Sequence, residues 1–282
     1  MTIGLVLVVI GASLFNILPL MTAGAADKLG FSGREAGWMS SVLTVASGVG
    51  CLISGGWVRS LRWPRAAAVS LGGMFAADFA TLFVRDYAAF VAMQGIAAFF
   101  ASAVFSLGMT ILSDGHKSAR SFGIAISAQS AYQIAALWAG PSLLRLSGLD
   151  GVLLLLAIPA AVVIALTPLL PAQGRPLAAE QSARGLLKPA TLLAFAGFGI
   201  FYMGAGAYWT YLELMGQALG MTTGAVAGWA AAGVAAGIPA GLIASAQGRR
   251  FGNLRPLGGA GLLMVIAAIP LSGAYGFLGF GI

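Results

Sequence analysis

Residues 29–32 read LGFS and residues 219–222 read LGMT, and this echo decides the fold. It continues after one extra residue in the second copy, because AGW at 36–38 recurs at 227–229, a spacing of 191 residues. Self-similarity at a fixed spacing indicates a repeated structural unit. The sequence therefore predicts two similar halves, of which this chain contains the second only in part.

Small residues extend the echo along the segments that follow. At the same spacing, Ala46, Gly50 and Ser54 fall on Gly237, Gly241 and Ser245. Such a stripe lets two membrane helices approach closely. Both stripes lead into an arginine-rich loop, at Arg59 and at Arg250, so an even number of membrane spans separates them. We expect parallel repeats of six helices, because two five-helix halves would recur at a shorter spacing.

The composition is that of a membrane protein. Of 282 residues, 59% are hydrophobic and 8% are charged, whereas soluble domains carry about 25% charged residues. The net charge of +7 comes from short basic clusters between apolar runs, which indicates membrane topology rather than nucleic-acid binding. A single cysteine, Cys51, and a single histidine, His116, exclude a disulfide framework and a cysteine metal site. We expect no metal and no cofactor.

Nine apolar runs approach or exceed the length of about 20 residues that a membrane-spanning helix needs. We expect spans at 3–26, 36–58, 66–84, 87–112, 119–144, 151–171, 190–213, 221–247 and 257–273, with the start of a tenth before Ile282. The fold class is therefore an all-α membrane protein. The expected divisions are an N-terminal six-helix bundle over 1–171, a polar cytoplasmic linker over 172–189, and a partial C-terminal bundle over 190–282.

The basic residues divide unequally between the two sides of the membrane. When the spans alternate, one side receives four: Lys28, Arg34, Arg85 and Arg145. The other side receives eleven: Arg59, Arg62, Arg65, Lys117, Arg120, Arg175, Arg184, Lys188, Arg249, Arg250 and Arg255. Since cytoplasmic loops carry the excess of Lys and Arg, we expect a multi-pass protein of the inner membrane with a cytoplasmic N-terminus.

The topology, the repeat, the linker and two loops together resemble the major facilitator superfamily. In that family, the loop after the second helix reads Gly, three residues, Asp, Arg, Gly and further basic residues. Residues 55–65 (GGWVRSLRWPR) and 248–255 (GRRFGNLR) match its placement and basic character, although Arg59 stands where the Asp is expected. Two marks of proton-coupled drug exporters are missing: Val91 replaces an arginine, and no paired glycines follow Gly140-Pro141.

The resemblance implies twelve helices in two parallel halves that transport a small organic solute by alternating access. Such transport would be secondary, with a proton as a candidate coupling ion. For the arginines of the two loops it implies a cytoplasmic gate, with simple membrane anchoring as the alternative; these are Arg59, Arg62, Arg65, Arg249, Arg250 and Arg255.

Polar side chains within the apolar runs are candidates for the solute cavity, because a polar group is costly in lipid. Spacings of three and four residues place Gln129, Tyr132 and Gln133 on one helical face. The full candidate set is Asn16, Gln94, Gln129, Tyr132, Gln133, Tyr202 and Tyr208. The alternatives are hydrogen bonding between helices and, for the tyrosines, an aromatic belt at the membrane surface.

Two acidic residues are candidates for proton coupling. Asp78 lies in the middle of its run, seven residues before Arg85 and on the same helical face. Glu213 follows an aromatic cluster near the outer end of its run. The alternatives are a structural carboxyl group bonded to a neighbouring helix for Asp78, and a water-exposed position for Glu213.

Other functions stay open at this point. The same fold could serve as a non-transporting membrane sensor or scaffold, or the chain could be an inactive truncated transporter; solute flux would separate these from a transporter. An enzyme lacks a catalytic constellation, because the acids lie on different segments and no histidine accompanies a nucleophile. The expected partners are the lipid bilayer, a small organic solute, and a chain that supplies the missing helices.

Purified alone, the 282-residue chain should transport solutes poorly or not at all. The reason is that helices ten and eleven close the cavity in the resembled family, whereas this chain contains only the start of the tenth. Uptake of solutes into proteoliposomes tests this, with protein-free liposomes as the control. Substrate-specific uptake by this chain alone would contradict the expectation.

Overall fold

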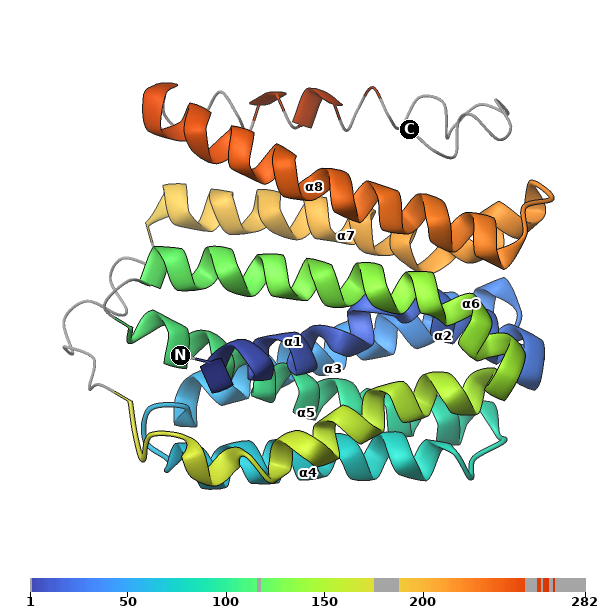
Figure 1. The fold of residues 1–282 in the computed structure, drawn as a ribbon, viewed down its shortest axis with the longest axis horizontal. Helices are drawn as coiled ribbons and strands as arrows, with labels where there is room; N and C mark the ends of the chain where they lie inside the picture. The colour runs from blue at the N-terminus through green and yellow to red at the C-terminus, as the bar shows by residue number, and fades with distance from the viewer. Residues whose placement is uncertain are drawn as a thin grey trace.

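The computed structural model describes residues 2–115, 118–174, 188–251, 258–259, 261–263 and 266. Within these residues the secondary structure is helical and contains no strand. The elements are α1 Thr2–Asn16, α2 Leu18–Leu29, α3 Gly33–Trp57, α4 Trp63–Thr81, α5 Tyr87–Ser113, α6 Ser118–Ile164, the short 3-10 helix η1 Thr167–Leu169, α7 Pro189–Ala218 and α8 Thr223–Phe251. The helices run along one common direction (Figure 1), and helices satisfy their own backbone hydrogen bonds, as a lipid environment requires.

The bundle has two ends, which we name by their loops. The linker end, at the left of Figure 1, holds residues 58–62 and 172–174. The far end holds the turns at 30–32, 82–86 and 219–222.

The first apolar run forms two helices rather than one. α1 and α2 are bent by 43° with Ile17 between them. Pro19 lies in the first turn of α2 and has no N–H to give to the carbonyl four residues earlier, which is that of Phe15. The bend therefore leaves the Phe15 carbonyl free to bond elsewhere.

α6 covers two of the expected runs. It is broken at Gly148, whose φ of 59° and ψ of −152° are not helical, and its ribbon turns back at the far end (Figure 1). The reversal separates a first segment, 118–147, from a second, 149–164. An ion pair between Lys28 and Asp150 joins α2 to the start of the second segment.

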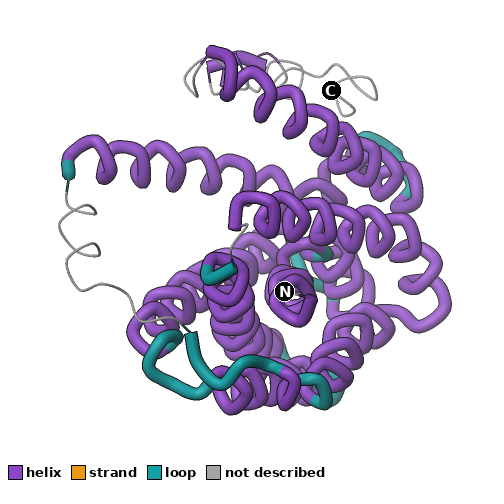
Figure 2. The backbone as a smooth tube through the Cα atoms, turned by 60° about the vertical axis from the view of Figure 1, so that its left-hand side comes forward, coloured by secondary structure: helices purple, strands orange, loops and turns teal. Residues whose placement is uncertain are grey.

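α1 lies inside the bundle and is surrounded by other helices (Figure 2). It packs on α5 and α6, while α3 and α4 also pack on α5. The α1–α5 contact is close enough to need glycine on both sides. A Cβ at Gly11 would lie 2.5 Å from the Phe105 nitrogen and 2.7 Å from the Ala101 oxygen, and one at Gly108 would lie 2.9 Å from the Gly4 oxygen.

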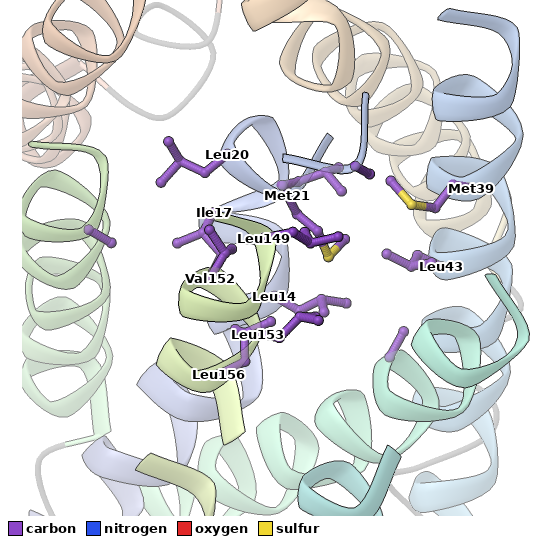
Figure 3. Packing of buried hydrophobic residues seen from close by; sticks show 14 of the residues in the cluster. Leu14, Ile17, Leu20, Met21, Met39, Leu43, Leu149, Val152, Leu153 and Leu156 are labelled. Atoms are coloured by element: carbon purple, nitrogen blue, oxygen red, sulfur yellow. The ribbon is translucent and has the colours of Figure 1, made fainter. Parts of the chain in front are cut away.

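Apolar side chains fill the space between these helices at the far end. Figure 3 shows Leu14, Ile17, Leu20 and Met21 of α1 and α2, Met39 and Leu43 of α3, and Leu149, Val152, Leu153 and Leu156 of α6. All are nearly or fully buried. Burying a large aliphatic side chain contributes about 1.5–3 kcal/mol in water, but within lipid the gain comes from close packing.

The echo in the sequence corresponds to a repeated turn in the structure. Gly30 and Gly220 adopt left-handed backbone conformations, with φ of 71° and 76°. Two residues later a hydroxyl caps the next helix: Ser32 accepts from the Glu35 N–H, and Thr222 accepts from the Ala225 N–H. A glycine followed by a Ser or Thr cap therefore ends one helix and begins the next in both halves.

The two small-residue stripes differ in their surroundings. On α3, a Cβ at Gly50 would meet the Phe99 carbonyl and the Ser102 hydroxyl of α5, as expected for close packing. On α8, a Cβ at Gly233 or Gly237 would meet nothing within 4 Å among the described residues. The predicted close approach is therefore confirmed for the first stripe only.

Four described helices are long and apolar enough to span a membrane: α3, α5, α6 and the Thr223–Ala240 part of α8. The bent pair α1–α2 makes a fifth. α6 counts once although it contains a reversal, and most of the ninth expected run, 257–273, lies outside the described residues. The structure thus confirms an all-helical protein, and the number of nine spans stays a prediction.

Replacing Gly11 by Ala should destabilise the protein by about 1–3 kcal/mol, the usual cost of overpacking. The added methyl group would meet backbone atoms of α5, which cannot move aside as a side chain can. Thermal unfolding in detergent measures the effect. Gly72→Ala is the control, because its methyl group would enter open space; equal stability of the two variants would disprove the close α1–α5 contact.

A candidate solute and proton site

A buried carboxyl group forms the centre of the candidate site. Asp78 of α4 is fully buried. Gln94 of α5 donates from Nε2 to Asp78 Oδ1 at 3.2 Å and to Thr81 Oγ1 at 3.1 Å. Thr81 in turn donates to the Ala77 carbonyl. Asp78 and Gln94, which were separate candidates in the sequence, therefore belong to one hydrogen-bonded group.

Two atoms of this group have no hydrogen-bond partner among the described residues. They are Asp78 Oδ2 and Gln94 Oε1. An unpaired buried polar atom costs about 1–3 kcal/mol, and an ionised carboxylate would cost more. A proton on Asp78 Oδ2 would remove the charge of the carboxylate, and water or a polar solute could then form hydrogen bonds with both atoms.

A second polar pair lies on α1 and α6. Gln129 Nε2 donates to Asn16 Oδ1 at a long 3.4 Å, and Asn16 Nδ2 has no partner in the described part of the chain. The Tyr132 hydroxyl also has no hydrogen-bond partner there, although it lies near Ser13 and Asp78. The structure therefore brings Asn16, Gln129 and Tyr132 to the same part of the bundle as the Asp78 group.

The remaining cavity candidates lie elsewhere. Gln133 is half-buried on the first segment of α6, and no contact links it to the Asp78 group. Tyr202 is 57% exposed and lines a different pocket, between α3 and α7. Tyr208 packs against Leu212 and other residues of the α7–α8 turn.

Glu213 is buried within the second half, 1% exposed, rather than open to water. Gln217, one turn later on α7, donates to its Oε1 at 3.2 Å. The proposed alternative of an exposed Glu213 is therefore wrong, because the α7–α8 turn covers it. Thr223 at the start of α8 also bonds the Glu213 carboxyl group, and neither Gln217 nor Thr223 belongs to the Asp78 group.

The expectation that Asp78 and Arg85 share a helical face is wrong. α4 ends at Thr81, and the chain leaves the helix before it reaches Arg85. The Arg85 guanidinium donates to the carbonyls of Leu82 and Val84 instead. The physical reason is the short turn at the far end, where Asp86 already caps α5.

The candidate gate arginines divide into three groups. Arg59 pairs with Asp114, with Nη1 3.0 Å from Oδ1, and so joins two loops of the linker end. Arg62 and Arg65 are exposed and line a pocket between α3 and α4. The side chains of Arg249 and Arg250 and the whole of Arg255 lie outside what the structure describes.

Three consecutive residues of α7 contact the N-terminal helices near the far end. Trp209 Nε1 donates at 2.8 Å to the Phe15 carbonyl, which has no donor within its own helix. The Thr210 hydroxyl donates to the Gly206 carbonyl. Because its hydrogen is used there, Ser40 Oγ is the donor in the 2.6 Å hydrogen bond to Thr210 Oγ1. Next, the Tyr211 hydroxyl lies against Gly37, where a Cβ would overlap it. Sequence reasoning missed Ser40, Thr81 and Thr210, since a hydroxyl in a helix commonly bonds its own backbone.

A pocket of about 550 Å³ opens beside these contacts. Ser40, Ser41 and Thr44 of α3 line it together with Tyr202 and Tyr211 of α7. Within the described residues, no group of three or more His, Cys, Asp or Glu side chains could hold a metal ion.

Comparison with known proteins supplies the family. The family model described as "Major Facilitator Superfamily" matches residues 3–282. The chain belongs to the major facilitator superfamily. It is therefore a multi-pass membrane transporter and not an enzyme.

Solved structures of superfamily transporters share its fold. The nucleoside transporter NupG, solved as a D323A mutant, is 18% identical with a TM-score of 0.65, and the match covers 89% of this chain and 68% of that one. A D-xylose-proton symporter is 12% identical with a TM-score of 0.58, covering 88% of this chain and 69% of that one. At these identities the likeness shows the fold alone. A search of curated proteins finds no match.

Replacing Gln94 by Leu should destabilise this transporter by about 1–3 kcal/mol, because Asp78 Oδ1 then loses its donor. The double variant Asp78→Val/Gln94→Leu should recover part of that loss, since both polar groups are gone. Thermal unfolding of the two single variants and the double variant measures the coupling between the residues. Strictly additive losses would show that the bond contributes nothing.

Proposed function

We propose that this superfamily member binds a small, uncharged, polar organic solute and couples its transport to a proton. The observation that carries the proposal is the group of buried polar side chains on four helices, α1, α4, α5 and α6, several of whose atoms have no hydrogen-bond partner among the residues that the structure describes. In a membrane protein, such groups are retained at a cost and mark a pathway or a binding site.

The chemistry of the group favours an uncharged solute. Asn16, Gln94 and Gln129 offer amide donors and acceptors, and Tyr132 adds a hydroxyl group. Apart from Asp78, none of these side chains carries a fixed charge that would pair with an ionic solute. Hydroxyl groups on the solute would satisfy the amide atoms, because each can donate and accept.

Asp78 is the proposed proton carrier. A proton on Oδ2 would make the buried carboxyl group neutral while Oδ1 keeps its bond from Gln94. Release of that proton leaves a buried carboxylate, which is unfavourable unless water or an opened structure solvates it. Proton occupancy would thus follow the conformational state of the transporter. Glu213, with an amide partner on its own helix, is the weaker candidate.

We further propose that the linker end is cytoplasmic, in the inner membrane, and that the chain makes nine spans. The arginine-rich loop at 58–62 and the end of α8 at Phe251 lie at the linker end (Figure 1), which supports this orientation under the positive-inside rule. Residues 1–171 would then move as one bundle against 190–282, with 172–189 as the linker. The contacts of Trp209, Thr210 and Tyr211 near the far end support an inward-open state.

In that orientation, the gate arginines lie on the open side. Arg59, with its partner Asp114, braces the N-terminal bundle, and Arg249, Arg250 and Arg255 are the proposed contribution of the second half.

Equilibrium binding of radiolabelled D-xylose and uridine to the purified chain tests the site without requiring a complete transport cycle. Binding should strengthen as the pH falls, because a neutral Asp78 leaves this group of buried side chains uncharged. Asp78→Asn, which mimics the protonated form, should bind equally at all pH values, whereas Asn16→Ala/Gln129→Ala should lose binding at least tenfold.

Two matched controls accompany these variants. Asp27→Asn makes the same chemical change at an exposed position of the far end, and Gln173→Ala removes an exposed amide of the linker end; both should bind as the unmodified chain does. If neither solute binds, the proposed substrate class is wrong. If solute binding by Asp78→Asn still depends on pH, Asp78 is not the residue that carries the coupled proton.

A further inference from the structure

The linker end contains a crevice on the outer surface of the bundle. α3 and α4 both pack on α5, and the space between them is a pocket of about 420 Å³. Phe99, Phe100 and Ala103 of α5 form its floor. The volume lies within the range of small-molecule sites, about 300–1,000 Å³.

The crevice faces away from the second half. Gly50 and Trp57, which line it, lie on the side of α3 that packs on α5. Gly37 and Ser41, which line the pocket against α7, lie on nearly the opposite side, since successive helical residues turn by about 100°. The rim includes Val69, which is 67% exposed. A crevice with an apolar rim on the outside of a membrane bundle has lipid as its neighbour.

Two arginine side chains lie at the mouth of the crevice. Arg62 and Arg65 line the crevice and are exposed, and their guanidinium groups make no ion pair or hydrogen bond within the part of the chain that the structure describes. Arg59 next to them differs, because Asp114 neutralises it. The first turn of α4 begins here too, and the positive end of its dipole favours an anion.

One polar side chain lies deep inside. Ser70 lines the crevice, is 4% exposed, and has no hydrogen bond to a described residue. Its hydroxyl group can donate a hydrogen bond to a ligand in the crevice. The crevice therefore combines a cationic mouth, apolar walls and a serine hydroxyl group, which is the pattern of a site for an amphipathic anionic ligand.

We propose that this crevice is a binding site for an anionic phospholipid of the leaflet at the linker end. Arg62 and Arg65 hold the headgroup phosphate, Ser70 donates to an ester oxygen, and an acyl chain lies along Phe99, Phe100 and Val69. The site goes beyond the proposed function: it requires the linker end to lie at a membrane surface but requires neither solute binding nor proton coupling. Nothing in it depends on which leaflet that is.

Native mass spectrometry of the purified chain with dioleoyl phosphatidylglycerol tests the site, with dioleoyl phosphatidylcholine as the uncharged comparison. The first phosphatidylglycerol should bind more tightly than phosphatidylcholine. Arg62→Gln/Arg65→Gln should weaken that first binding about thirtyfold, which corresponds to about 2 kcal/mol at roughly 1 kcal/mol per arginine.

Arg34→Gln/Arg85→Gln is the matched control, because it removes the same charge from exposed positions at the far end. It should leave the first binding event unchanged. Equal weakening by both double variants would overturn the proposal, since it would mean that net charge alone attracts the lipid.

A third variant separates lipid from a free anion. Val69→Trp keeps both arginines and fills the apolar rim, so it should weaken binding of the dioleoyl lipid, and inorganic phosphate should not displace that lipid. Displacement by phosphate, or unchanged binding in Val69→Trp, would make this an anion site without an acyl-chain slot. Because the readout is lipid mass and not transport, its failure is distinct from failure of the proposed function.

Discussion

The contact between α1 and α5 is made of backbone rather than of side chains, and the other helices depend on it. Gly11 and Gly108 bring the two helices together until a single methyl group would collide with main-chain atoms. In lipid, where no hydrophobic effect drives helices together, contact of this kind supplies the association energy. α3 and α4 then pack on α5, and α6 packs on α1. The polar groups of α1, α4, α5 and α6 meet only because this contact fixes the rotation of each helix.

Much of the fold was predictable from the sequence, because apolar runs and turn residues report it directly. The LGFS and LGMT segments predicted a repeat, and each contains a left-handed glycine followed by a capping hydroxyl. The two runs within 119–171 predicted a reversal, and Gly148 supplies it. The prediction that Asp78 and Arg85 share a helical face was wrong for a local reason. The far-end turn begins at Leu82, so α4 ends before it reaches Arg85.

The site was predictable as a set of residues but not as an arrangement. The cost of polar groups in lipid identified Asp78, Gln94, Asn16 and Gln129 individually. Their pairing depends on the relative rotation of two helices, which no single helix pattern contains. The bond from Trp209 to the Phe15 carbonyl illustrates the same limit: Pro19 predicts that some carbonyl is released, but not that α7 supplies the donor.

Gly148 folds α6 back on itself, so that both of its segments reach the same apolar cluster. Ala136 and Leu137 of the first segment share that cluster with Leu149 and Val152 of the second, and the end of the second segment packs with residues of α4. The backbone conformation between them is one that essentially only glycine adopts. A side chain at position 148 would strain this conformation, so the reversal that brings the two segments of α6 side by side depends on the identity of a single residue.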